Sequence, residues 1–151
     1  RRQRTEEEAQ RQRPIDIENT AQRVRETAER WGIQFSNTEV NRWAGGLVEK
    51  KLSDEDLMMQ LRQQSQTMFP WKPPEMETVT AAGPWMQTFE RVMERKASLF
   101  DPKVQKALSS GTPVWEFEQE LKKSPDWLGT KNGQSDMYSA VSEAGRRMGF
   151  A

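Results

Sequence analysis

The chain of 151 residues contains no cysteine and no histidine. Disulfides, zinc sites and iron–sulfur clusters therefore have no ligands, and nucleophilic catalysis of the Ser-His or Cys-His type is excluded. Carboxylate chemistry remains, but a glycosidase needs two carboxyl groups at a set separation, one of them with a raised pKa. The acidic clusters at residues 54–56 and 116–120 fit helix starts and solvated faces better. We therefore expect no catalytic residue, no metal and no cofactor.

Apolar residues and net charge are also scarce. Hydrophobic residues make up 34% of the chain, and the mean hydropathy is −0.97. No run approaches the roughly 18 apolar residues of a membrane span. Lysine plus arginine and aspartate plus glutamate are equal at 23 each, whereas a dedicated nucleic-acid binder normally has a basic excess. So little apolar material predicts either an exposed tail or an apolar surface completed by a partner.

Strand signals are nearly absent, because no window alternates β-branched or aromatic residues with polar ones. Helix-start signals recur instead, with serine or threonine caps and prolines that suit a first turn. They stand at Ser36, Ser53, Pro102, Pro113, Ser124 and Thr130. The pattern predicts an all-α fold: a charged helical arm over residues 1–32, then a compact, irregular multi-helix domain over residues 33–151.

The arm begins with residues that are almost wholly charged or glutamine. Thr5 and Glu8 form a capping box, so residues 5–13 are either a solvated helix or a mobile tail, and Pro14 is expected to interrupt. One apolar stripe follows at helical spacing and ends before a capping glycine, Gly32. It consists of Ile17, Ala21, Val24, Ala28 and Trp31.

The stripe has two interpretations. The same spacing suits a helix that packs on its own domain and a short coiled-coil seam, so we treat its residues as a candidate oligomer or partner interface. The arm is also rich in arginine, including Arg1, Arg2 and Arg4. Acidic residues neutralise most of this charge, so a nucleic-acid contact there is the less favoured alternative.

Several features of residues 33–151 call for specific expectations. Gly45 and Gly46 fall inside a predicted helix, where they indicate either close approach by another helix or a break. A single helix is expected from residue 78 or 80 to about residue 96, with Pro84 in its first turn. Tryptophans in this part are candidate core or partner-facing aromatics: Trp43, Trp71, Trp85, Trp115 and Trp127.

The last predicted helix starts at Thr130 and ends before Gly149. Its apolar residues are Met137, Val141, Ala144 and Met148, again spaced by three or four. This is the pattern of one helical face.

A set of caps and aromatic anchors resembles a known family. It runs from Ser-Asp-Glu-Asp-Leu at 53–57 through Phe69-Pro70, Gly83-Pro84-Trp85, Phe100-Asp101-Pro102, Phe117-Glu118 and Ser124-Pro125-Asp126-Trp127 to Met148-Gly149-Phe150. These residues resemble a helical segment near the C-terminal end of large virion proteins of tailed phages of actinobacteria. The chain departs from the pattern at Trp85, where tyrosine is expected, and at Lys123, where arginine is expected.

The resemblance implies a mostly helical virion protein of the tape-measure or internal ejection type. Its partners would be other virion proteins of the tail or portal and copies of itself, and its location the tail or the particle interior. The Arg-Arg-Gln-Arg start favours a piece of a longer polypeptide, with a processed terminus as the alternative. We expect docking, with a peptidoglycan-active domain or a nucleic-acid-contacting module as alternatives.

Overall fold

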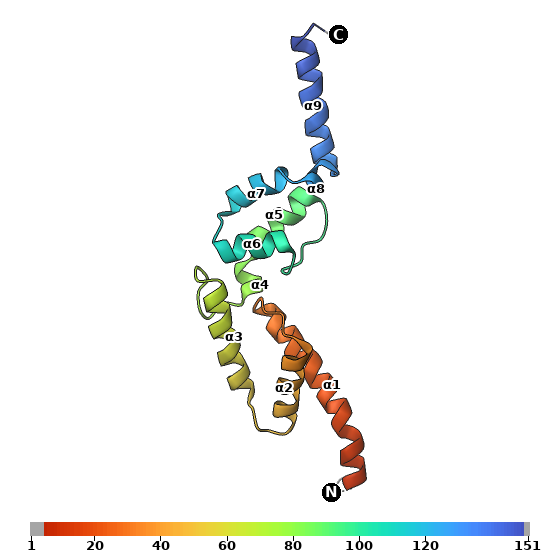
Figure 1. Ribbon diagram of the computed structural model, residues 1–151, viewed down its shortest axis with the longest axis vertical. Coiled ribbons are helices and arrows are strands. Elements are labelled where there is room, and N and C mark those ends of the chain that lie inside the picture. The colour runs from red at the N-terminus through yellow and green to blue at the C-terminus, as the bar shows by residue number, and fades with distance from the viewer. Residues whose placement is uncertain (1–4, 150–151) are drawn as a thin grey trace. The chain divides into compact units, whose positions relative to one another are not determined.

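The computed structural model describes residues 5–149, which form nine helices and no strand (Figure 1). The predicted all-α fold is confirmed. Arg1, Arg2, Arg4 and Phe150 lie outside the described residues. The helices are α1 Glu6–Arg30, α2 Asn37–Val48, α3 Asp54–Met68, α4 Thr78–Ala81, α5 Gly83–Met93, α6 Pro102–Ser110, α7 Val114–Lys122, α8 Pro125–Leu128 and α9 Lys131–Arg147.

The chain divides into two compact units, residues 1–81 and residues 82–151. This division differs from the expected arm at 1–32 and single domain at 33–151. The physical reason is that the second half of α1 packs against α2 and α3, so it belongs to the first unit rather than to a separate arm.

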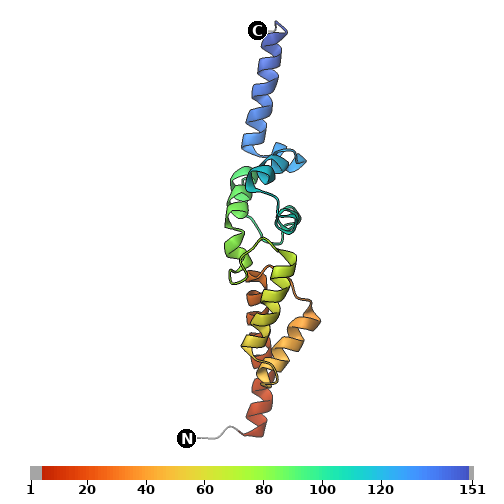
Figure 2. The same cartoon turned by 90° about the vertical axis from the view of Figure 1, so that its left-hand side faces the viewer.

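In the first unit, α1, α2 and α3 surround one apolar core and lie side by side in both views (Figures 1 and 2). Packing the three faces together removes large apolar side chains from water, which is the main stabilising contribution. The core comprises Val24, Ala28, Trp31, Ile33, Trp43, Leu57 and Leu61, and a smaller cluster of Ala21, Val40 and Ala44 adjoins it.

The first helix is continuous through Pro14, so the expected interruption is wrong. Proline removes one backbone donor from the helix, but the turns before it are solvent-exposed, where water can satisfy the freed carbonyl. Two local contacts support this end. Thr5 and Glu8 complete the predicted capping box, and Arg13 forms an ion pair with Glu49 after α2.

The turn after α1 brings distant parts of the first unit together. Gly32, at φ +75°, closes it as predicted: its N–H donates to the carbonyl of residue 29, and that of Ile33 to the carbonyl of residue 28. The buried Thr78 hydroxyl donates to the Trp31 carbonyl at 2.7 Å. Because this uses its only proton, the Ser65 hydroxyl, 2.8 Å away, must be the donor to Thr78.

The second unit is built around α5, which packs against α6, α7 and α8. The single helix expected from residue 78 or 80 to 96 is two helices, α4 and α5. Pro84, in the first turn of α5, has no N–H for the carbonyl four residues earlier, and Glu94, at φ 55°, ends α5 early. The core contains Phe89, Val92, Met93, Leu99, Val104, Ala107, Leu108, Phe117, Leu121 and Trp127.

Candidate partner-binding surface

The apolar stripe predicted as an interface is an internal face of the first unit. Val24 and Ala28 are fully buried, and Ala21 and Trp31 are nearly so, because α2 and α3 occupy the positions that a partner helix would take. Ile17 alone is half-buried and lines an open groove with Pro14 and Asn41. Of the two interpretations of this stripe, packing within its own domain accounts for the burial, so the interface interpretation is corrected.

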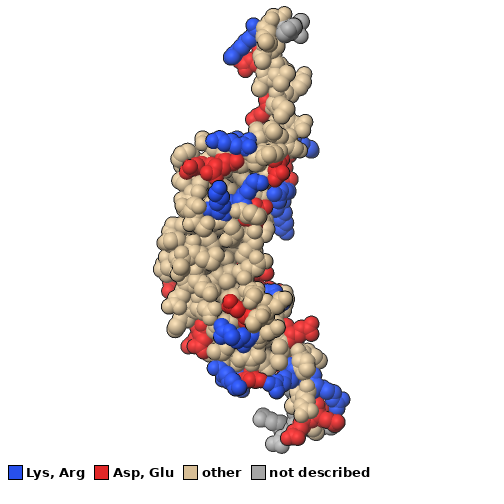
Figure 3. Space-filling view, viewed as in Figure 1, with Lys and Arg blue, Asp and Glu red and all other residues tan. Residues whose placement is uncertain are grey.

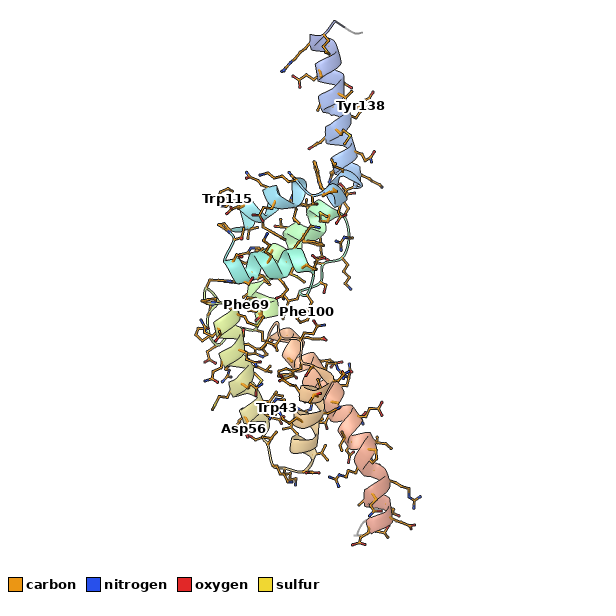
Figure 4. The ribbon with its side chains drawn as sticks, viewed as in Figure 1. Trp43, Asp56, Phe69, Phe100, Trp115 and Tyr138 are labelled. Atoms are coloured by element: carbon orange, nitrogen blue, oxygen red, sulfur yellow. The ribbon has the colours of Figure 1, made fainter. Side chains whose placement is uncertain are left out.

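The five tryptophans occupy different environments. Trp43 and Trp127 are buried, whereas Trp71 and Trp85 are half-buried, and the Trp85 indole donates to the carbonyl of residue 112 at 2.8 Å. Trp115 is 65% exposed at the start of α7 (Figure 4). It lies two residues before the buried Phe117, which places the two side chains on different faces of the helix. Trp115 is therefore the tryptophan best placed to meet a partner.

The arginines of α1 are largely engaged by acceptors within the first unit. Arg23 lies 2.8 Å from Asp54, and Arg30 lies 2.9 Å from Glu77. Arg11 pairs more loosely with a glutamate one turn earlier on α1, and Arg13 pairs with a glutamate that follows α2. These pairings reduce the positive charge left for phosphate.

Three residues of the acidic clusters, Asp54, Asp56 and Glu118, serve as cap or ion-pair partners. Asp56 accepts the backbone N–H of Ser53 at 2.9 Å, which completes a capping box, and Asp54 is engaged by α1. The guanidinium of Arg91 donates to Glu118 and holds the pKa of that carboxyl below its usual range. Within residues 5–149, no group of three or more acidic side chains is arranged to hold a metal ion.

Among the charged residues that the structure describes, Lys72 is the buried one. Lys72, 1% exposed, donates to the carbonyls of residues 73 and 76 and lies 4.9 Å from the centre of the Trp31 ring. Burial lowers the pKa of this amine, and Glu75 partly opposes the shift. The contacts satisfy the ammonium within the protein and fix the proline-rich connector after α3, which is a structural role.

The last helix, α9, carries an apolar face that nothing in its own unit covers. Met137 is 48% exposed, Val141 66% and Met148 74%, and Ala144 shares their side of the helix at the same spacing. We call these four residues the α9 stripe. Gly133 is the only buried residue of α9, so the stripe stabilises nothing within the described part of the second unit.

Two views show the surroundings of this helix. In Figure 3 the visible side of α9 is mostly uncharged, with its charged groups gathered along one edge. Figure 4 places Tyr138 on α9, away from the other helices of the second unit, and this residue is 75% exposed. Isolated exposed apolar residues are normal on a protein surface, whereas a continuous exposed row along one helix is a candidate interaction site.

The start of α9 is held firmly by the rest of the second unit. Thr130 accepts the backbone N–H of Gly133 at 3.0 Å, and the Glu94 carboxylate accepts the N–H groups of Lys131 and Asn132 at 3.2 and 2.9 Å. The bond from Asn132 is the largest of several contributions that lower the pKa of Glu94. A carboxylate at this end also complements the helix dipole.

Close packing fixes the same junction. A methyl group on Gly133 would lie 2.1 Å from the carbonyl oxygen of Trp127, so only glycine lets α9 start against the α8 turn. The N-terminal end of α9 is thus fixed by packing and hydrogen bonds, while the apolar face along the rest of the helix is exposed to solvent. Sequence reasoning had the necessary signal, the spacing at residues 137–148, but assigned interface character to the equally spaced stripe of α1.

Comparison with known proteins adds no assignment. No family model, no curated protein and no solved structure matches the chain. The described residues also include no helix with the length and apolar character required to span a membrane.

Proposed function

We propose that this chain is a protein-docking module that uses the α9 stripe to bind a protein partner. The observation that carries the proposal is a row of exposed apolar side chains on a helix whose start is fixed and whose length is unpartnered. Covering such a row with a second apolar face removes it from water, at roughly 25 cal/mol for each Å² buried. A prepositioned helix also loses little conformational entropy on binding.

The setting that we propose is a tailed-phage virion, as the C-terminal part of a tape-measure or internal ejection-type protein. The support for this setting is the resemblance carried by residues 53–150. The partners would be virion proteins of the tail or portal, or copies of the chain itself. The absence of histidine and cysteine supports docking rather than catalysis, as do the roles of Asp54, Asp56 and Glu118 as cap and ion-pair partners.

The proposal is tested by placing a charge on the stripe within the phage that encodes the chain. Val141→Asp should reduce the yield of infectious particles or the amount of this protein in them, because a carboxylate is costly to bury. Ser139→Asp is the matched control, since Ser139 lies on the opposite side of α9 and should leave particles unchanged. The proposal is rejected if both variants give the same yield of infectious particles with the same amount of this protein. It is also rejected if this protein is absent from wild-type particles.

A further inference from the structure

We propose that the partner of the α9 stripe is α9 of a second copy of this chain, packed antiparallel. This inference rests on the proposed docking function and names its occupant. Three properties of α9 carry it: the symmetry of the apolar spacing, the positions of small and large residues beside the stripe, and the distribution of charge.

The spacing of the stripe reads the same from both ends. Its steps are four, three and four residues, so an antiparallel second helix that sets Val141 opposite Ala144 also sets Met137 opposite Met148. The two inner levels then join a valine to an alanine, and the two outer levels join two methionines, whose thioether side chains adapt well to such contacts. A surface that fits itself in this way is the requirement of a two-fold symmetric dimer.

The residues that flank the stripe fit the same alignment. Tyr138, 75% exposed, would lie beside Gly145 of the second copy, where the missing side chain leaves room for an aromatic ring. Tyrosine buried in this way keeps its hydroxyl at the wet edge of the contact. In a parallel pair the two tyrosines would instead lie at the same level on opposite edges of the contact, and neither would lie beside Gly145 of the second copy.

Charge also favours the antiparallel orientation. Arg146 and Arg147 stand in the last turn of α9, whereas Asp136 stands near its start. A parallel pair gathers both arginine pairs at one end, while an antiparallel pair places Arg147 on the same edge as Asp136 of the second copy. Exposed charges of this kind contribute little affinity but select orientation. The formal net charge of zero removes long-range repulsion between copies.

The size of the contact sets its strength. The stripe spans eleven residue steps, about 16 Å of helix at 1.5 Å per residue. A contact between two single helices of this length is smaller than a standard interface, so the dimer should be weak and dependent on concentration.

Sedimentation equilibrium of the 151-residue chain tests the association. The mass should rise towards a dimer as concentration increases. Val141→Asp changes both copies, so it should weaken dimerisation about a hundredfold or more, the factor that corresponds to losing the burial of two valines. Ser139→Asp should associate like the unmodified chain, and circular dichroism of both variants should show the same helix content. A chain that stays monomeric at millimolar concentration overturns the inference.

Cross-linking tests the orientation of the two helices. Because the chain has no native cysteine, only the introduced thiols react. Met137→Cys and Met148→Cys chains, one with a mass tag, are mixed and treated with a short bismaleimide. An antiparallel pair yields the mixed product, because two copies of residue 137 would be about 16 Å apart along the axis. Products that join like positions overturn the antiparallel arrangement. If the chain stays monomeric but Val141→Asp still depletes phage particles, only the self-pairing fails and the docking function stands.

Discussion

Two neighbouring glycines in α2 provide a sharp test of the packing in the first unit. Gly45 and Gly46 have the same helical setting, but a methyl group on Gly45 would meet nothing within 4 Å. A methyl group on Gly46 would lie 2.4 Å from Cδ1 and 2.7 Å from Cγ of Leu52. Leu52 packs against the core, so its side chain cannot withdraw without losing contacts. The close approach expected at these glycines comes from this leucine rather than from another helix.

The two substitutions should act in opposite directions. Gly45→Ala should raise the free energy of unfolding by about 0.5–1 kcal/mol, the difference in helix propensity. Gly46→Ala gains the same amount but forces Leu52 from its place, which costs about 1–3 kcal/mol. Subtracting one variant from the other cancels the propensity and leaves the packing cost.

Urea unfolding followed by tryptophan fluorescence measures both, with Trp31 and Trp43 in the affected core as reporters. The slope of the free energy of unfolding against urea concentration should be the same in all variants, so that a shift in the midpoint reports a change in stability. The double variant Gly46→Ala with Leu52→Ala should show coupling, because the leucine is the group that clashes. Equal free energies of unfolding for the Gly45→Ala and Gly46→Ala chains would refute the close packing of Leu52 against Gly46.

Three further predictions concern contacts within the two units. Thr78→Val should lower the free energy of unfolding by about 1–3 kcal/mol, since it leaves the Trp31 carbonyl without its donor; urea unfolding of Thr78→Val beside Thr78→Ser, which keeps the hydroxyl, checks it. Gly133→Ala should lower the thermal midpoint followed by circular dichroism, because its methyl group meets the Trp127 carbonyl; an unchanged midpoint would contradict the packing at the start of α9. The folded-state pKa of Glu94 is lowered, so its stabilisation is full above its unfolded pKa and is lost as pH falls through the folded value; thermal midpoints should lose that component of their acid dependence in Glu94→Gln, and an identical pH profile would contradict it.

The sequence predicts helices well where local signals agree. Thr5, Ser36, Ser53 and Thr130 each cap the helix expected from them. Failures occur where two local signals compete. At Pro14, for example, the missing donor is outweighed by helix-forming neighbours on both sides.

The binding surface could be predicted only in part. Helical spacing identifies an apolar face on α1 and another on α9, but spacing does not tell which face the remainder of the chain covers. That depends on contacts distant in sequence, such as those of Trp31 with residues of α2 and α3. The exposed position of Trp115 is likewise set by which side of α7 meets α5.

In the virion setting that we propose, the most direct test of docking through α9 is photo-cross-linking inside purified phage particles. A benzophenone amino acid replaces Tyr138 beside the α9 stripe or, as the control, Ser139 on the opposite side of the helix. The account predicts a defined cross-link to a virion protein from position 138, to a second copy of this chain if the antiparallel pair forms, and none from position 139. Equal labelling from both positions, or none from position 138, would contradict the claim that this face of α9 binds a partner.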